Sequence, residues 1–513
     1  MRPGKRRALP ILAVVCTIAA TVAYAAAAAP PDDTPDRPHS QNMHLLGSSL
    51  RAGAVTGPPP VGPGDVPWDT RNTDLAFWGK TVIQGRYDGF RVIDIRAPGN
   101  PRELAFFTCV SPQGDIGVYG NLVFRSVDSP QVTDQCTEES QSGNPTGADC
   151  APATSPCTGF EGIQIFDISD LNDIQLVKSV PLDCGSHTHT VVPDPARSRV
   201  LIYNSVSGTG VQANPGKFGN RCPGLPFNRE DIVEVPLSDP ASASVIGSFS
   251  LGQMPSPDNR PIQACHDMGV ILGSVNRAAC AGNPGVSVFD ISDLESPVFL
   301  YATSAPTVTS WHSAVWSWDG STLVTGWEPG GGTAPRCQET GAPISPPTAG
   351  SSVQTDEMKT LFFHDGVTGE IIGRHVLPRP QSEWENCTIH NYNIVPHATR
   401  DLLVHGSYQA GTALVDFTDP ANAYEVAWMD PHPLDPPSDT SPGGRTNFRG
   451  GDWSSYWYNG LIYESDTRRG LYVWNVSGRE VSGPTIRLDY LNPQTNHLSI
   501  PVDAKGPKGP RRR

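Results

Sequence analysis

Histidines recur at equivalent points of a repeating sequence pattern in this chain, and imidazole can bind a metal or transfer a proton near neutral pH. Each stands where the first strand-like segment of a repeat begins, and four consecutive repeats are involved. The five side chains are His187, His189, His266, His312 and His390. Because equivalent positions of a closed array of repeats face a common point, we expect these imidazoles to converge.

The chemistry of such a cluster depends on what lies between the rings. Imidazole nitrogens suit copper, zinc, iron or nickel, and nearby carboxylates fix the ring tautomer. Carboxylates stand at matching points of other repeats, among them Asp74, Asp115 and Asp452. A copper or zinc ion would supply a redox or Lewis-acid centre. Two other interpretations stay open: metal-free acid–base chemistry, and histidines that only bond the backbone of the neighbouring repeat.

The elements that must position these histidines repeat along the chain. One element consists of a glycine, a run of β-branched or aromatic residues, and an aspartate. Such runs are typical of strands, and the aspartate is expected to cap the turn that follows. Seven segments follow the pattern, three of them less strictly; they span residues 89–95, 162–168, 285–291, 411–417, 231–235, 360–364 and 470–476.

Further strand-like runs flank each copy, so that one repeat supplies four strands. A lone four-stranded sheet cannot bury both faces, but seven such sheets packed in a ring can. The sequence therefore predicts an all-β fold, a seven-bladed β-propeller of four-stranded antiparallel blades. Residues 485–490 are expected to supply the last strand, so that no strand from the N-terminus is needed. The expected blades span about 72–108, 114–183, 186–251, 264–303, 310–378, 388–429 and 450–490.

The ends of the chain differ from the repeats in composition. A basic start followed by a short apolar stretch and an alanine-rich run is typical of a secretory signal peptide, expected at 1–29. An uncleaved anchor and a twin-arginine signal are the alternatives. We expect a proline-rich linker at 30–66, the propeller at 67–492 and a basic, disordered tail at 493–513.

Cysteine content and charge bear on location and partners. The chain has 11 cysteines; without Cys16 of the apolar stretch an even number remains, which predicts disulfides and an oxidising compartment. The formal net charge of -15 disfavours nucleic acid as a partner. We therefore expect a secreted, extracellular monomer with no membrane span after signal cleavage. Its partner would be an extracellular ligand or a cell-surface component.

The strongest copies also carry a family resemblance. Residues 91–95, 164–168, 287–291 and 413–417 read RVIDI, QIFDI, SVFDI and ALVDF, and they resemble the LVIVD-repeat family of secreted and surface bacterial proteins. The resemblance covers about 70–490 and implies a β-propeller, but no particular activity. The expected histidine cluster is similar in arrangement to the selenium-binding protein and methanethiol oxidase family, which implies copper. No sequence motif of that second family is present.

Two classes of function follow from these observations. The first is an extracellular binding or scaffold module, and it is favoured because the chain has no nucleophile elbow, phosphate-binding loop or zinc-protease helix motif. The second is a copper- or zinc-dependent oxidase or hydrolase that uses the five histidines as metal ligands, and it is favoured by their spacing. The binding module is our preferred interpretation, with the metal enzyme as the alternative.

Overall fold

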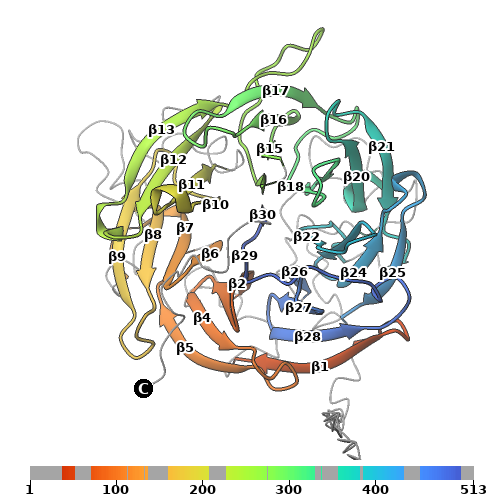
Figure 1. The fold of residues 1–513 in the computed structure, drawn as a ribbon, viewed down its shortest axis with the longest axis horizontal. Helices are drawn as coiled ribbons and strands as arrows, with labels where there is room; N and C mark the ends of the chain where they lie inside the picture. The colour runs from red at the N-terminus through yellow and green to blue at the C-terminus, as the bar shows by residue number, and fades with distance from the viewer. Residues whose placement is uncertain are drawn as a thin grey trace, which may run out of the picture.

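Seven β-sheets arranged in a ring make up the protein (Figure 1). The computed structural model describes residues 37–51, 71–111, 114–131, 133–136, 160–206, 227–273, 275–329, 337, 356–379, 381, 385–431 and 451–497. In this part of the chain the only helices are short 3-10 turns: η1 (Pro195–Arg197), η3 (Pro240–Ser242), η4 (Asp356–Lys359) and η5 (Pro420–Asn422). The predicted fold, a seven-bladed propeller of four-stranded antiparallel blades, is confirmed.

Each blade runs from an inner strand beside the channel to an outer strand at the rim. Blade 1 comprises β2 (Asn72–Trp78), β3 (Thr81–Arg86), β4 (Gly89–Asp94) and β5 (Arg102–Thr108). Blade 2 comprises β6 (Ile116–Tyr119), β7 (Leu122–Gln131), β8 (Phe160–Asp167) and β9 (Gln175–Pro181). Blade 3 comprises β10 (Thr188–Asp194), β11 (Arg199–Ser205), β12 (Arg229–Pro236) and β13 (Ser244–Ser250). Blade 4 comprises β14 (Met268–Leu272), β15 (Arg277–Ala281), β16 (Val286–Asp290) and β17 (Val298–Thr303). Blade 5 comprises β18 (Ser313–Trp316), β19 (Thr322–Gly326), β20 (Thr360–Asp365) and β21 (Ile371–Val376). Blade 6 comprises β22 (Tyr392–Val395), β23 (Leu402–Gly406), β24 (Thr412–Asp416) and β25 (Tyr424–Met429).

Blade 7 is closed by the N-terminal part of the chain, and this corrects the sequence prediction. Its strands are β26 (Asp452–Tyr458), β27 (Leu461–Asp466), β28 (Gly470–Val476) and, outermost, β1 (Met43–Leu50). The linker predicted at 30–66 is therefore wrong for the residues of β1, and the last strand predicted at 485–490 is wrong as well. Pairing the two ends of the chain in one blade closes the ring and covers the edge of β28.

The described C-terminal segment, up to residue 497, enters the channel. Strand β29 (Tyr490–Leu491) pairs with β2, and β30 (Thr495–His497) adds to β14 of blade 4 in parallel. The disordered tail predicted at 493–513 is therefore wrong for the residues of β30. The signal peptide predicted at 1–29 and the remainder of the tail lie outside the described residues.

The repeated sequence element forms the third strand of each blade, for two physical reasons. At Gly89 the backbone has φ +142, and a Cβ there would lie 1.9 Å from the Phe107 carbonyl oxygen of the next strand, so only glycine fits. The aspartates that end these strands accept a hydrogen bond from the amide two residues on, as predicted; they are Asp94, Asp167, Asp290 and Asp416.

Packing between neighbouring blades forms the core, because each sheet buries both faces against the next. Phe77 of blade 1 stacks on Tyr458 of blade 7 with the ring centroids 4.6 Å apart. The Trp316 indole of blade 5 donates to the Gly269 carbonyl of blade 4 at 3.1 Å. A close-packed ring of this kind holds the inner strands, and the residues just before them, in fixed mutual positions.

Candidate metal centre

Four of the five predicted histidines form a continuous line of rings across blades 3 to 6. Each stands immediately before or near the start of an inner strand, as expected from the sequence. The centroids lie 4.5 Å apart for His187 and His266, 3.8 Å for His266 and His312, and 4.4 Å for His312 and His390. We call these four residues the histidine row. Its His187 end is partly exposed, whereas His312 and His390 are each 3% exposed.

Glu328 faces the two buried histidines of the row. It lies just after β19, and its carboxylate oxygens are 3.6 Å from His312 Nε2 and 4.0 Å from His390 Nε2. One ligand atom from each of these three residues lies within 4.8 Å of the other two. Tyr408 Oη donates to Glu328 Oε1 at 2.6 Å, so the carboxylate is held in place from its other side.

The other ring nitrogens of these two histidines have partners that set the tautomers. His390 Nδ1 donates to the Trp453 carbonyl oxygen at 2.6 Å. His312 Nδ1 lies 2.5 Å from Ser313 Oγ, whose proton is directed to Asp267 Oδ2 at 2.7 Å, so we assign the proton of His312 to Nδ1. Both Nε2 atoms then present a lone pair toward Glu328. His312 Nε2 is buried with no hydrogen-bond partner among the described residues.

Electrostatics keep the buried part of the row neutral. Burial lowers the pKa of His390 to about 3, and burial together with the neighbouring histidines holds the pKa of His312 well below its usual value. Two neutral imidazoles and a carboxylate therefore lie around one buried spot, and these are donor types that can hold a metal ion.

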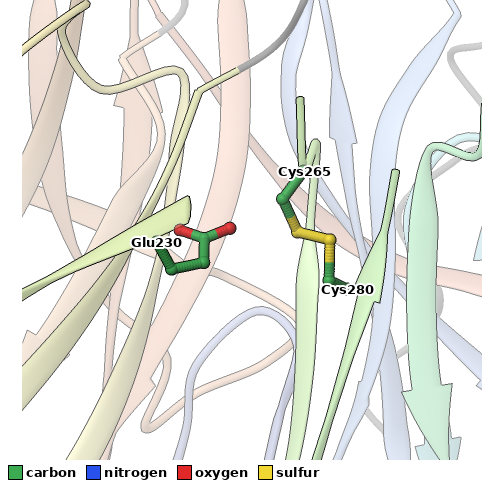
Figure 2. Close-up of side chains that lie close together, drawn as sticks. All are labelled: Glu230, Cys265 and Cys280. Atoms are coloured by element: carbon green, nitrogen blue, oxygen red, sulfur yellow. A yellow bond between two sulfur atoms is a disulfide. The ribbon is translucent and has the colours of Figure 1, made fainter. Parts of the chain in front are cut away.

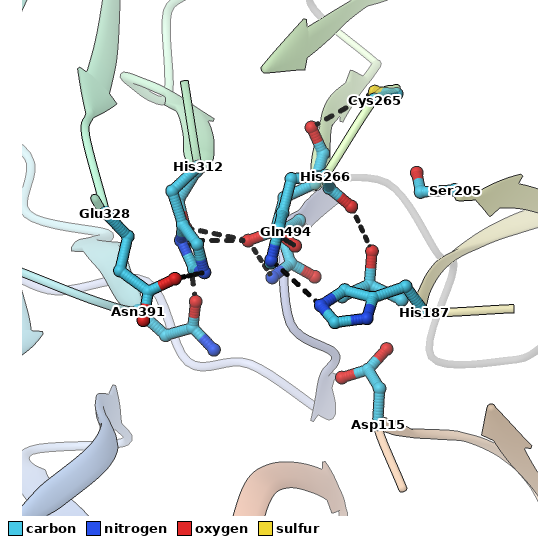
Figure 3. Close-up of polar contacts among 12 residues, drawn as sticks. Asp115, His187, Ser205, Cys265, His266, His312, Glu328, Asn391 and Gln494 are labelled. Carbon is cyan, nitrogen blue, oxygen red and sulfur yellow. Dashed lines mark hydrogen bonds and ion pairs between the residues drawn. The ribbon is translucent and has the colours of Figure 1, made fainter. Parts of the chain in front are cut away.

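The exposed end of the row has a different character. His187 Nδ1 lies 2.8 Å from Asp128 Oδ2. Its Nε2 lies 2.9 Å from His266 Nε2, and Figure 3 shows these two rings side by side. Burial opposes protonation of His187, but the hydrogen bond and charge of Asp128 raise its pKa. Burial, and then the neighbouring His187, lowers the pKa of His266. His187 is thus the histidine of the row best placed to carry a proton.

Asp267 connects the row to the rest of the channel. Its Oδ1 lies 3.1 Å from His266 Nδ1, and its Oδ2 accepts hydrogen bonds from Ser313 and from Gln494 Nε2, the latter at 3.0 Å. Burial alone would raise the pKa of Asp267, but the charge of His266 and these donors lower it. A carboxylate that is bonded in this way orients the imidazole of a metal site.

His189, the fifth predicted ligand, is directed elsewhere. Its Nδ1 lies 2.8 Å from Ser126 Oγ and 3.2 Å from Asp115 Oδ2. The ring packs against Gly117 of β6, where a Cβ would come within 2.9 Å of His189 Nε2. The structure thus gives His189 a role in packing blade 3 against blade 2, although its sequence position is adjacent to the row.

A second group of acids lies in blade 7, but a cation of the chain already occupies it. Asp452, Glu464 and Asp466 are fully buried and present oxygens within 4.8 Å of one another. The Arg37 guanidinium pairs with Glu464 and lies 2.5 Å from Asp466 Oδ2, and Arg469 lies 2.7 Å from the same oxygen. The two arginines neutralise most of the charge, so this group needs no metal.

A third group contains a disulfide. Figure 2 shows Glu230 beside the bond between Cys265 and Cys280. Sulfur atoms joined in this way are not thiolates and make poor metal ligands. Two more disulfides join Cys109 to Cys136 and Cys337 to Cys387, which fits the prediction that the cysteines form disulfides.

Sequence inspection missed three residues of the site: Asp128, Glu328 and Tyr408. A usable signal existed for Glu328, because the loops after second strands open on the same face as the starts of inner strands. The same signal applies to Tyr408, which follows β23, the second strand of blade 6. It lies in a loop with a left-handed backbone, φ +45, and only the closed ring brings it to Glu328.

Comparisons with known proteins do not name a family or an activity. No protein-family model matches the chain, and no curated protein matches its sequence. A functionally unknown protein from Desulfotomaculum acetoxidans DSM 771 is 12% identical with a TM-score of 0.40, covering 69% of this chain and 84% of its own. A chain of the mitotic checkpoint complex is 11% identical with a TM-score of 0.39, covering 84% and 99%. Neither similarity is close enough to indicate a function.

The described residues also bear on membrane association. None of their helices has the length and apolar character that crossing a bilayer requires.

Proposed function

We propose that this protein is an extracellular binding propeller that holds one copper or zinc ion at the buried end of its histidine row. The observation that carries the proposal is the convergence of His312 Nε2, His390 Nε2 and the Glu328 carboxylate on one buried spot. Two nitrogens and one oxygen are a donor set that suits these metals. Ligand atoms about 2.1 Å from a zinc ion lie about 3.4 Å apart. The carboxylate oxygens of Glu328 lie 3.6 Å from His312 Nε2 and 4.0 Å from His390 Nε2, so side-chain rotations would complete the site.

The remaining residues of the row have supporting roles in this proposal. His266 is the nearest further nitrogen donor, because it lies with Asp267 and His312 in a second group of ligand atoms within 4.8 Å. His187 and Asp128 would hold a proton at the exposed end, and Tyr408 would keep Glu328 in its ligand position. When bound, the metal would supply Lewis-acid or redox chemistry.

We further propose that the chain is secreted and belongs among LVIVD-repeat proteins. The disulfides support an oxidising compartment, and the recurrence of the repeat in the third strands supports the family resemblance. The partner would be an extracellular ligand or cell-surface component that reaches the His187 end of the row. A metal-dependent oxidase or hydrolase is the alternative, favoured by the hydrogen-bonded pair of His187 and Asp128 at the other end of the same row.

Metal analysis of the untagged mature protein tests the proposal. We expect about one copper or zinc ion per chain after reconstitution, since the donor set is preformed. His312→Ala and Glu328→Gln should each weaken binding by about tenfold or more, because each removes one of three ligands. The matched control is His44→Ala, which removes an exposed histidine of β1.

Two results would contradict the proposed metal site. A wild-type protein that takes up neither metal during reconstitution would exclude the proposed site. Equal metal affinity in His312→Ala, Glu328→Gln and His44→Ala would show that any bound metal lies elsewhere. In either case the histidines would have the structural role that the sequence left open.

A further inference from the structure

The C-terminal segment of the chain fills the centre of the ring in a way that its composition did not suggest. We call residues 490–497, which contain β29 and β30, the channel plug. Figure 1 shows β29 and β30 inside the ring of blades, next to the inner strands. Asn492, Gln494, Thr495 and Asn496 are all at least nine-tenths buried, which is unusual for four polar residues near a chain end.

The plug bonds to the inner strands of several blades. The Asn492 carboxamide both donates to and accepts from the Val118 backbone of blade 2, at 2.9 and 2.7 Å. Thr495 Oγ1 donates to the Val191 carbonyl oxygen of blade 3 at 2.9 Å. The Asn496 carboxamide donates to the Trp316 carbonyl oxygen of blade 5 at 2.5 Å. These side chains replace the water that would otherwise satisfy the inner strands.

One residue of the plug reaches the histidine row. Gln494 Nε2 donates to Asp267 Oδ2 at 3.0 Å, and Asp267 Oδ1 contacts His266 Nδ1. Figure 3 shows Gln494 beside His266. Gln494 has a left-handed backbone, φ +57, which is costly for a residue with a side chain. The amide of Val270 donates to the Gln494 carbonyl at 2.7 Å and holds that backbone against β14.

We propose that the channel plug supports the histidine site through one residue, Gln494, which is a positioning residue that acts through Asp267. Without the Gln494 bond, Asp267 Oδ2 would keep only the Ser313 donor, so the carboxylate would be held less firmly against His266 and Ser313. The Ser313 hydroxyl sets the His312 tautomer, so the change would reach the ligand atoms themselves. The expected effect on metal affinity rests on the proposed metal site. The seating of the plug in the channel does not depend on that proposal.

The test combines two substitutions with two truncations. Gln494→Met keeps the volume of the side chain and removes the donor, and Thr495→Val removes a plug hydrogen bond that does not touch Asp267. Truncation after residue 489 deletes the plug, whereas truncation after residue 497 deletes only the basic tail. Copper or zinc affinity is measured by titration, and hydrogen exchange at the Val270 amide reports whether the plug is seated.

The expected results separate positioning from folding. Gln494→Met should weaken metal binding by about tenfold, the lower end of the range for residues that orient metal ligands. Thr495→Val should leave the affinity unchanged, and Val270 should stay protected in both variants. The longer truncation should expose the Val270 amide to exchange and weaken binding, while the shorter one should change neither.

Other outcomes would overturn the inference and can be told apart from failure of the proposed function. Unchanged affinity in Gln494→Met with Val270 still protected would show that Gln494 does not position the site. If the wild-type protein binds no metal, the proposed function fails and exchange alone decides on the plug. Equal Val270 exchange in the two truncated proteins would then show that the plug is not seated.

Discussion

Individual buried residues of the channel are held in protonation states that they would not have in water. Asp74 of β2 accepts hydrogen bonds from Tyr456 Oη at 2.5 Å and from the Asn391 carboxamide at 2.8 Å. Burial outweighs these donors and raises the pKa of Asp74 to about 7. The native protein therefore keeps a proton on Asp74 at pH values where the unfolded chain would have lost it.

This protonation predicts a pH-dependent contribution to stability. The contribution is fully present below the unfolded pKa near 3.8 and is lost as the pH rises to about 7. The slope should be at most about 1.4 kcal/mol per pH unit, since one proton is involved. Asp74→Asn mimics the protonated form and should flatten the dependence of the unfolding free energy on pH between 4 and 7. An unchanged slope in this variant would assign the dependence to other groups.

At the scale of elements, the ring depends on a strand contributed by the opposite end of the chain. Strand β1 pairs with β28, and Arg37 lies before β1 in ion pairs with the buried acids Glu464 and Asp466. Its guanidinium also stacks over the Tyr472 ring, 3.8 Å from the centroid. Arg37 thus joins the N-terminal segment to blade 7 through charge as well as through backbone pairing.

Loss of this arginine should weaken the closing blade. Arg37→Ala removes the arginine partner of the buried Glu464 carboxylate and leaves Asp466 with Arg469 alone, and we expect a loss of about 3–5 kcal/mol in unfolding free energy. The control is Arg51→Ala at the other end of β1, which breaks the partly exposed pair with Glu103 and should cost about 0–1 kcal/mol. Denaturant unfolding measures both. Similar small losses in the two variants would mean that Arg37 does not anchor β1.

For the whole molecule, a disulfide joins two segments of the ring that are far apart in sequence. Cys337 and Cys387 are 50 residues apart in sequence and are both buried beside Leu377 and Ala410. The bond restricts the unfolded chain far more than the folded one, which already holds these residues together. It therefore belongs to the stability of the ring as a whole and not to the metal site.

Removing this disulfide tests its contribution. The double variant Cys337→Ala with Cys387→Ala should lose about 4 kcal/mol of unfolding free energy, as expected from loop-closure entropy for a loop of this length. Because neither cysteine contacts the proposed metal ligands in the described residues, metal affinity should persist in the folded variant. A loss of metal binding at full stability would contradict this separation of roles.

The sequence by itself determined the blade architecture and the approximate place of the histidines. The clearest third strands repeat because they place a glycine where strands approach and an aspartate where the chain turns, as at Gly89 and Asp94. The inner-strand starts then lie on one face of the ring, so the convergence of His312 and His390 follows from local patterns and closure alone.

Only the tertiary structure decided which residues complete the site and how the ring closes. Glu328, Tyr408 and Gln494 reach the histidine row or Asp267 from separate loops and from the chain end, and no local periodicity marks them. Likewise, β1 and the channel plug resemble linker and tail in composition. Their structure is induced by the open edge of β28 and by unsatisfied groups along the channel, which exist only after the blades have formed.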